Sequence, residues 1–134
     1  MLYGGRWNSP GKRVIYAAET YSGALLEVLV HRNGLRPPKH HQVVRILIPD
    51  DVSTETVALG GVPGWDDEDN RALRLFGDAW IDQKRTLLLR VPSVVAEGRD
   101  YNLVINVEHP EFRKLQPEPP VPVRWDPRLM SGRQ

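Results

Sequence analysis

The sequence predicts a single α+β domain. Its 134 residues are enough for one domain with a hydrophobic core and too few for two domains of ordinary size. Segments typical of strands and helices follow one another irregularly, without the repeated strand–helix–strand order of a doubly wound parallel sheet. The sequence contains no internal repeat of solenoid length. We therefore expect residues 1–134 to form one α+β domain.

The N-terminal segments predict a turn, a strand and a helix. Residues 4–11 are rich in glycine, serine and proline, a composition typical of turns because glycine permits positive φ and proline resists helix formation. Residues 14–18 form a short apolar run that predicts a buried strand. Ser22 is a candidate N-cap for a helix over residues 23–31, and the Asn-Gly pair at residues 33–34 is a typical helix end.

The remaining chain predicts a second helix and further strands. Acidic residues at 66–69 precede a helix that runs to about Asp82, with apolar residues at three-four spacing. Residues 110–115 indicate a short turn or helix. Segments that are apolar, β-branched or alternating predict four more strands, at residues 43–48, 86–91, 102–107 and 121–125.

Composition argues against several classes of function. Eighteen basic and seventeen acidic residues give a formal charge of +1, so a basic field for direct nucleic-acid binding is not expected. The chain has no cysteine, which removes disulfides, thiolate zinc sites and a cysteine nucleophile. It has neither an apolar run of about 20 residues nor a typical signal peptide. We expect a soluble, cytoplasmic protein without a membrane partner.

Glu27 is the most testable candidate for a catalytic group. In the predicted helix it shares a narrow arc with Gly23 and His31, opposite a broad arc of leucines and valines. The absence of a side chain at Gly23 would leave room for a ligand above the carboxylate. Alternatively, the arc faces solvent and Glu27 forms a weak pair with His31. The helix pattern alone favours this second interpretation.

The other candidate residues also have ordinary structural explanations. Arg6 follows two glycines, which let the backbone approach a ligand while the guanidinium binds phosphate oxygens, yet an arginine in a turn often pairs with a carboxylate or stacks on Trp7. Tyr16 is either core filling or a ring at the mouth of a cleft. Ser93 is a local cap or a ribose contact, and Asn106 needs a specific hydrogen-bond partner because asparagine is disfavoured inside strands. The histidines have no spacing typical of a metal site, so no metal is expected.

Taken together and in this order, these segments resemble the RES-domain family of bacterial toxins, which is named for an arginine, a glutamate and a serine. The resemblance includes Gly-Arg-Trp-Asn at the first turn, Gly-Asp-Ala-Trp in the second helix and Val-Pro-Ser after an apolar strand. The resembling segments are residues 5–27, 77–80, 89–93, 102–109 and 125–129.

The resemblance implies a fold similar to ADP-ribosyltransferases, with two small β-sheets packed crosswise and flanking helices around a NAD cleft. Such toxins break the bond between nicotinamide and ribose in NAD. Nicotinamide leaves as a neutral molecule, so the reaction requires no general acid, in contrast to ordinary glycoside hydrolysis with its two carboxylates. NAD would therefore be a substrate, and no metal is implied.

The resemblance also implies a role for each candidate residue. Arg6 would bind the pyrophosphate or the adjoining ribose, and Glu27 would bind the nicotinamide ribose and stabilise its developing positive charge. Tyr16 would stack on or orient the nicotinamide side, with Trp7 as a second ring. Ser93 and Asn106 would supply supporting polar contacts.

The acceptor of ADP-ribose could be a bacterial protein, water or phosphate. We favour a bacterial protein. The family implies the toxin of a type II toxin–antitoxin system, with an Xre-type antitoxin that forms a hetero-oligomer and covers the cleft. A NAD glycohydrolase or phosphorylase that depletes NAD is the first alternative. A non-enzymatic interaction module is the second, and an RNA-cleaving toxin is disfavoured by the balanced charge.

Overall fold

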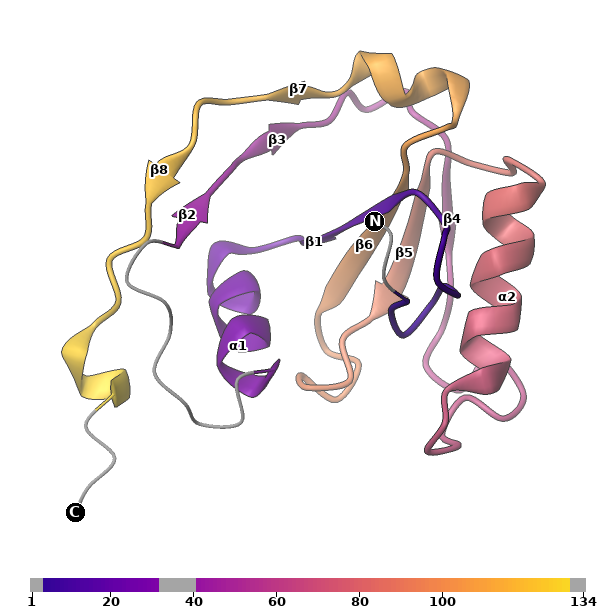
Figure 1. The fold of residues 1–134 in the computed structure, drawn as a ribbon, viewed down its shortest axis with the longest axis horizontal. Coiled ribbons are helices and arrows are strands. Elements are labelled where there is room, and N and C mark those ends of the chain that lie inside the picture. Colours follow the sequence, from indigo (N-terminus) through magenta and orange to yellow (C-terminus); the bar gives the residue numbers. More distant parts are fainter. Residues whose placement is uncertain (1–3, 32–40, 131–134) are drawn as a thin grey trace.

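A mixed four-stranded sheet forms the centre of the protein, whose computed structural model describes residues 4–31 and 41–130 (Figure 1). The strand order is β1-β6-β5-β4, with β6 antiparallel to both neighbours and β4 parallel to β5. The strands are β1 (Val14–Ala18), β4 (Thr54–Thr56), β5 (Leu88–Pro92) and β6 (Tyr101–Asn106). The predicted α+β class is confirmed.

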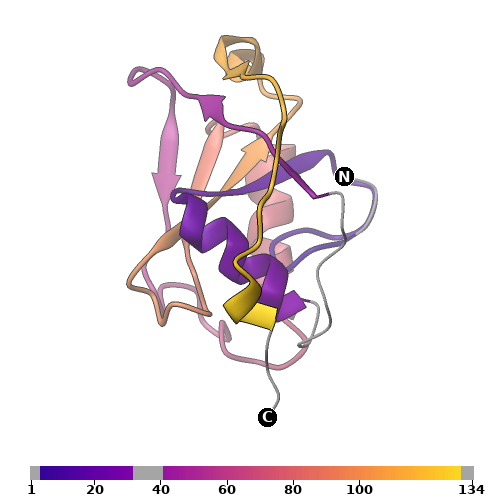
Figure 2. The same cartoon turned by 90° about the vertical axis from the view of Figure 1, so that its left-hand side faces the viewer.

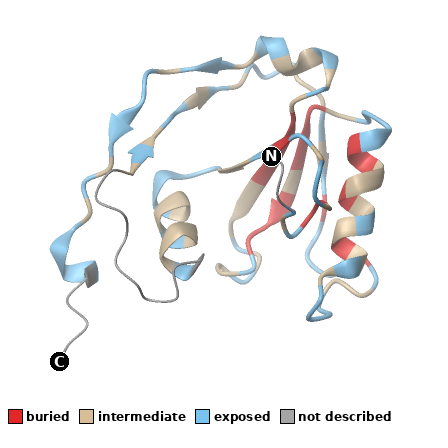
Figure 3. Cartoon of the chain, in the orientation of Figure 1, coloured by how far each residue is buried: buried red, intermediate tan, exposed pale blue. Residues whose placement is uncertain are grey.

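Helix α2 (Arg71–Asp82) covers one face of this sheet (Figure 1). Its buried residues include Leu73, Trp80 and Ile81, and they pack with apolar residues of the sheet such as Leu89 and Val104. Figure 3 shows the buried residues concentrated in the sheet and along the side of α2 that faces it. The three-four spacing seen in the sequence thus produces the main core.

A smaller apolar cluster covers the opposite face. Leu88 and Ile105 alternate with the residues of the first core along their strands, so their side chains point the other way. They pack against Ile46 of β3 (Ile46–Leu47) and Phe112 of the 3₁₀ helix η1 (Pro110–Lys114). The sheet is therefore buried from both sides.

Helix α1 (Tyr21–His31) follows β1 and lies between the sheet and an extended C-terminal arm (Figures 1 and 2). The arm runs antiparallel to the segment that follows α1, through two two-stranded ladders, and it ends in a second 3₁₀ helix. The ladders pair β2 (Gln42–Val43) with β8 (Val121–Pro122) and β3 with β7 (Gln116–Pro117), and the 3₁₀ helix is η2 (Pro127–Met130).

Several predicted boundaries are wrong for identifiable reasons. Residues 43–48 do not form one strand, because β2 and β3 pair with different segments of the arm. The last predicted strand, at 121–125, is limited to β8, where its ladder ends. Strand β4 was not predicted because its three residues, Thr-Glu-Thr, carry no apolar signal. Helix α1 begins before Ser22, and the hydroxyl of Thr20 accepts a hydrogen bond from the Gly23 amide at 3.0 Å.

Candidate active site

The carboxylate of Glu27 is held by one side chain from the sheet and one from the loop that follows β5. Its Oε2 atom accepts a hydrogen bond from Asn102 Nδ2 at 2.9 Å and another from Ser93 Oγ at 3.2 Å. Glu27 is half-buried, and its two partners come from β6 and from the end of β5. The solvent-facing interpretation of Glu27 is therefore wrong. Helix α1 and the β5–β6 hairpin, which are distant in sequence, thus meet at one carboxylate.

Ser93 is fixed by the tight loop that it begins. Its backbone amide donates to Asp100 O and its carbonyl accepts from the Gly98 amide, both at 2.9 Å. Its hydroxyl oxygen also accepts from the Ala96 amide at 3.3 Å. A hydroxyl has one proton to donate. The Ala96 amide can only donate to the Ser93 oxygen and the Glu27 carboxylate can only accept, so the hydroxyl proton is directed to Glu27. Buried Ser93 is therefore a preorganised donor.

Polar contacts attach the start of α1 to the sheet. Glu19 forms an ion pair with Arg90 of β5 at 2.5 Å, and the Arg90 guanidinium stacks over the Tyr101 ring at 3.8 Å from its centroid. A Cβ atom on Gly23 would lie 2.8 Å from the capping hydroxyl of Thr20. Gly23 is thus needed for the close fit of the helix cap.

The turn that carries Arg6 is tied together by Tyr16. Gly5 and Asn8 form an isolated antiparallel bridge, in which the Gly5 amide donates to Asn8 O at 2.9 Å. The Tyr16 hydroxyl accepts from the Trp7 amide at 3.2 Å and donates to Asn8 Oδ1. A Cβ atom on Gly5 would lie 2.5 Å from the Tyr16 hydroxyl oxygen, so glycine is required there. The tyrosine therefore holds the turn in shape.

Burial in this position raises the pKa of Tyr16 to about 12, although the hydrogen bond from the Trp7 amide acts in the opposite direction. The hydroxyl is consequently neutral at physiological pH. A neutral phenol can donate to Asn8 and accept from Trp7 at the same time, which is what the turn requires.

The same turn is docked on α2. The Ser9 amide and hydroxyl both donate to the carboxylate of Asp78, at 2.9 and 2.5 Å. The Trp7 ring packs edge-on against Phe76, with 6.1 Å between centroids. A Cβ atom on Gly77 would lie 1.7 Å from the Trp7 carbonyl oxygen. The Gly-Asp pair of α2 thus makes the surface on which the turn rests.

Arg6 extends from this turn to the start of α2. Its Nη1 atom donates to Asn70 Oδ1 at 3.0 Å, and its side chain is otherwise exposed. Among the described residues, no ion pair joins Arg6 to a carboxylate. The guanidinium is thus oriented by a neutral acceptor.

The candidate site has two parts, the Glu27 carboxylate with its partners and the turn that carries Arg6. Both lie over the same face of the sheet. Tyr16 is paired with Val104, and Ala18, two residues later, is paired with Asn102. Side chains two residues apart in a strand point to the same face. Tyr16, which holds the Arg6 turn, and Asn102, which holds Glu27, are therefore diagonal neighbours on the face that α2 packs against.

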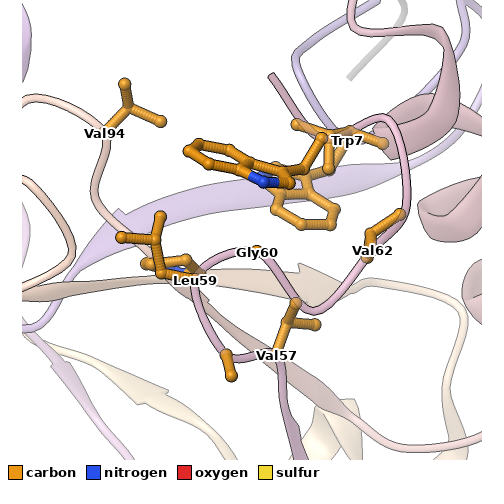
Figure 4. A pocket seen from close by; sticks show the side chains of 10 residues that line it. Trp7, Val57, Leu59, Gly60, Val62 and Val94 are labelled. Atoms are coloured by element: carbon orange, nitrogen blue, oxygen red, sulfur yellow. The ribbon is translucent and has the colours of Figure 1, made fainter. Parts of the chain in front are cut away.

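An apolar pocket is lined by residues that adjoin Arg6 and Ser93 in the sequence. It includes Trp7, which follows Arg6, and Pro92 and Val94, which flank Ser93. In the close-up, Trp7, Leu59, Val62 and Val94 surround the space, with Val57 at its side (Figure 4). Trp7 is therefore buried in the core with one side lining this pocket.

Asn106 is placed apart from the other candidates. It is fully buried at the opposite end of β6 from Asn102. Its Nδ2 atom donates to Ile81 O at 3.2 Å, and its Oδ1 atom accepts from the Glu108 amide at 3.0 Å. The expectation that Asn106 converges with Glu27 and Ser93 is therefore wrong. Its amide joins the sheet to α2.

Asn102 is the partner of Glu27 that the sequence analysis missed. Asn102 and Asn106 are four residues apart in one strand and point to the same face, so their local patterns are equivalent. The pairing of β6 with β5 distinguishes Asn102 from Asn106 as the residue near Ser93. An antiparallel hairpin brings the start of β6 to the end of β5, where Ser93 lies.

Two negative findings apply to the described part of the chain. Residues 4–31 and 41–130 contain no group of three or more histidine, cysteine, aspartate or glutamate side chains arranged to hold a metal ion. Within the same ranges, no helix has the length and apolar character that crossing a membrane would require.

Comparison with known proteins gives the family. A model of the RES domain matches residues 1–126. A protein named Prs ADP-ribosylating toxin, from Sphingobium sp. (strain YBL2), is 38% identical over 133 residues, covering 96% of this chain and 82% of that protein. Proteins named Toxin Res are 38% identical in Pseudomonas putida, covering 85% and 79%, and 31% identical in Yersinia enterocolitica, covering 95% and 84%. The chain therefore belongs to the RES-domain family of toxins.

Proposed function

We propose that this protein is the toxin of a type II toxin–antitoxin system that cleaves the nicotinamide–ribose bond of NAD and transfers ADP-ribose to a bacterial protein. The observation that carries the proposal is the Glu27 carboxylate, bound by Ser93 and Asn102. The relative named Prs ADP-ribosylating toxin supports the type of reaction. We further propose an ADP-ribosyltransferase-like fold, in which the two-stranded ladders correspond to the second sheet.

The reaction breaks the bond between C1′ of the ribose and the nicotinamide nitrogen. The bonding electrons leave with the nitrogen, so nicotinamide departs neutral and positive charge develops on the ribose. A nucleophilic group of the acceptor then bonds to C1′ and loses its proton to solvent. Glu27 supplies a fixed negative charge next to the developing cation, and a preorganised polar group of this kind contributes about 3–4 kcal/mol.

Ser93 and Asn102 keep the carboxylate in place for this step. Both donate to Oε2 of Glu27, so the orientation of the carboxylate is set before NAD binds. Preorganisation of this kind avoids a reorganisation cost during the reaction. In this proposal Asn102 takes the supporting role that the sequence analysis gave to Asn106.

Arg6 binds the pyrophosphate of NAD in this proposal. Its planar guanidinium suits two phosphate oxygens at once, and its exposed position over the turn makes it accessible. Tyr16 acts by holding the Arg6 turn, because its hydroxyl is already bonded to Trp7 and Asn8. The pocket beside Trp7 and Val94 offers an apolar wall between Arg6, which binds the pyrophosphate, and Glu27, which binds the nicotinamide ribose.

The partner of the toxin is proposed to be an Xre-type antitoxin that forms a hetero-oligomer and covers the site. Co-expression should restore growth and yield a physical complex of the two proteins. Restored growth without such a complex would contradict this model of inhibition.

The proposal is tested by incubating purified protein with NAD and measuring free nicotinamide. We expect Glu27→Gln to release nicotinamide at least about 100-fold more slowly than the parent. A glutamine can turn its carbonyl oxygen toward Ser93 and Asn102, so the fold is kept while the charge is lost. Glu68→Gln, which changes an exposed carboxylate before α2, is the matched control and should react at the parental rate. An unchanged rate in Glu27→Gln would remove Glu27 as the catalytic carboxylate.

Mass spectrometry of bacterial proteins then identifies the acceptor. Transfer to protein predicts an added ADP-ribose on a protein of the lysate, in amounts that match the nicotinamide released. Free ADP-ribose in matching amounts would instead identify a NAD glycohydrolase, and ADP-ribose carrying a further phosphate would identify a phosphorylase.

A further inference from the structure

Asn70 stands at the N-cap of α2 but does not use its side chain as a cap. Its backbone is left-handed, with φ 55° and ψ 23°, and its side chain makes no capping hydrogen bond. The Arg71 amide is bound instead by Asp69 Oδ1 at 3.0 Å. Asparagine is among the few residues that adopt this conformation readily. Asparagine therefore fits this left-handed position, and its side-chain amide is available for another contact.

That contact is with Arg6. Asn70 Oδ1 accepts from Arg6 Nη1 at 3.0 Å, across 64 positions of sequence. The backbone on either side is fixed: Asn70 donates its amide to Asp67 O at 3.1 Å and accepts from the Arg74 amide at 3.0 Å. A long, exposed arginine side chain has many rotamers, and a fixed acceptor selects one direction for the guanidinium.

The acceptor, Asn70, is a neutral residue that directly follows four acidic residues. Residues 66–69 read Asp-Asp-Glu-Asp, and Asn70 follows them. A carboxylate in the place of Asn70 would form an ion pair with Arg6 and would compete with an anionic ligand for the guanidinium. An amide oxygen orients the guanidinium and leaves its positive charge in place. A guanidinium has five N–H donors, and the contact with Asn70 uses one of them.

We propose that Asn70 is a positioning residue, which directs Arg6 toward the diphosphate of the substrate without neutralising its charge. This inference rests on the proposed function, because it takes Arg6 as the diphosphate ligand. It adds a requirement that the family resemblance does not supply: the residue opposite Arg6 is a neutral acceptor in a left-handed conformation.

Two substitutions separate the contact from the backbone. Asn70→Gly keeps the left-handed conformation, since glycine adopts it without strain, and removes the acceptor. Asn70→Asp keeps both the acceptor and a residue that tolerates this conformation, and adds a negative charge. Glu68→Gln changes the charge of the same loop at an exposed position and is the matched control.

The ligand for the test is ADP-ribose, which carries the diphosphate of NAD and binds without any cleavage of a glycosidic bond. We expect the dissociation constant, measured by calorimetry, to rise about 5-fold in Asn70→Gly and about 10-fold or more in Asn70→Asp. Glu68→Gln should bind as the parent does. In steady-state reactions with NAD, Asn70→Gly should raise KM by a similar factor and leave kcat within about twofold, because Glu27 and its partners are untouched.

A double-mutant cycle with Arg6→Ala decides whether Asn70 acts through Arg6. In the Arg6→Ala background, Asn70→Gly should change ADP-ribose binding no further. An equal loss in both backgrounds, or parental binding by both Asn70 variants, overturns the positioning role while leaving the proposed function intact. Parental binding by Arg6→Ala overturns Arg6 as the diphosphate ligand and the positioning role with it. Failure of the parent to release nicotinamide overturns the proposed function alone, since ADP-ribose binding is measured independently.

Discussion

Helix α2 and helix α1 both contact the central sheet, but α2 is attached by apolar packing and α1 by polar contacts. Four residues of α2 are buried, including Leu73 and Trp80. Along α1, none of residues 21–30 is buried, and Leu26 and Val30 are exposed. Figure 3 shows this contrast between the two helices. The helix with the weaker apolar attachment is the one that presents the carboxylate of the candidate site.

The contrast explains why an amphipathic pattern gave the wrong direction for Glu27. In α2 the apolar residues point inward and the usual rule holds. In α1 the glutamate points inward to Ser93 and Asn102, while Leu26 points outward. A charged side chain on the inner face of a helix is stable only if its hydrogen bonds are supplied. The sheet and the loop after β5 supply them here.

The largest effect should follow a change on the packed side of the molecule. Gly77→Ala places a Cβ atom 1.7 Å from the Trp7 carbonyl oxygen, so the turn must move away from α2. We expect the free energy of unfolding to fall by about 3 kcal/mol or more, measured by chemical denaturation. Leu75→Ala, at an exposed position of the same helix, should change it by less than about 0.5 kcal/mol. A parental midpoint for Gly77→Ala would show that the turn is not seated on α2.

Two asparagines of β6 provide a paired test of the same contrast. Asn106→Ala leaves Ile81 O and the Glu108 amide without their partner at a fully buried side chain, and we expect a loss of about 2 kcal/mol in unfolding free energy. Nicotinamide release per folded molecule should be unchanged. Asn102→Ala should behave in the reverse way, with nicotinamide release about 10-fold slower and a stability loss below about 1 kcal/mol. The opposite assignment would identify Asn106 as the functional residue.

Tyr16→Phe should have a moderate effect that depends on pH. Loss of the hydroxyl leaves the Trp7 amide and Asn8 Oδ1 without their partner, and we expect about 1 kcal/mol of destabilisation near neutral pH. The pKa of Tyr16 is raised to about 12 in the folded protein. The hydroxyl therefore makes its full contribution to the unfolding free energy below the unfolded pKa of about 10. This contribution is lost as the pH rises from about 10 to 12, because only the unfolded chain releases the proton there.

The measurement for Tyr16 is the difference in unfolding free energy between parent and Tyr16→Phe at a series of pH values. This difference should be constant from pH 7 to about 9 and should decrease above about 10. A difference that does not change through pH 11 would mean that the hydroxyl is not buried in the turn.

The smallest effect should come from the outer face of α1. Leu26 is 41% exposed, and Leu26→Gln should change the unfolding free energy by no more than about 0.5 kcal/mol. Thermal melting monitored by circular dichroism is sufficient to measure it. A loss comparable to that of a core leucine, about 2 kcal/mol or more, would mean that α1 is packed as tightly as α2.

Local elements and individual site residues can be predicted from this sequence more easily than the contacts between them. The apolar runs at 14–18 and 86–91 and the three-four spacing of α2 are local signals, and the structure contains these elements. The contact of Asn70 with Arg6 and that of Asn102 with Glu27 join residues 64 and 75 positions apart. No periodicity in the sequence encodes such pairs, because they depend on strand order and register. Strand β4 was missed for a different reason, since its Thr-Glu-Thr sequence lacks even the local apolar signal of a strand.

The antiparallel pairing of β1 with β6 has a consequence for the synthesis of this protein. Residues 14–18 pair with residues 102–106, and sheets built from such distant pairs form slowly. Arg6 and Glu27 are translated first, and Ser93 and Asn102 follow 66 and 75 residues after Glu27. A nascent chain on the ribosome therefore holds the arginine and the glutamate without the partners that arrange them. The site is assembled only after residue 102 has been translated.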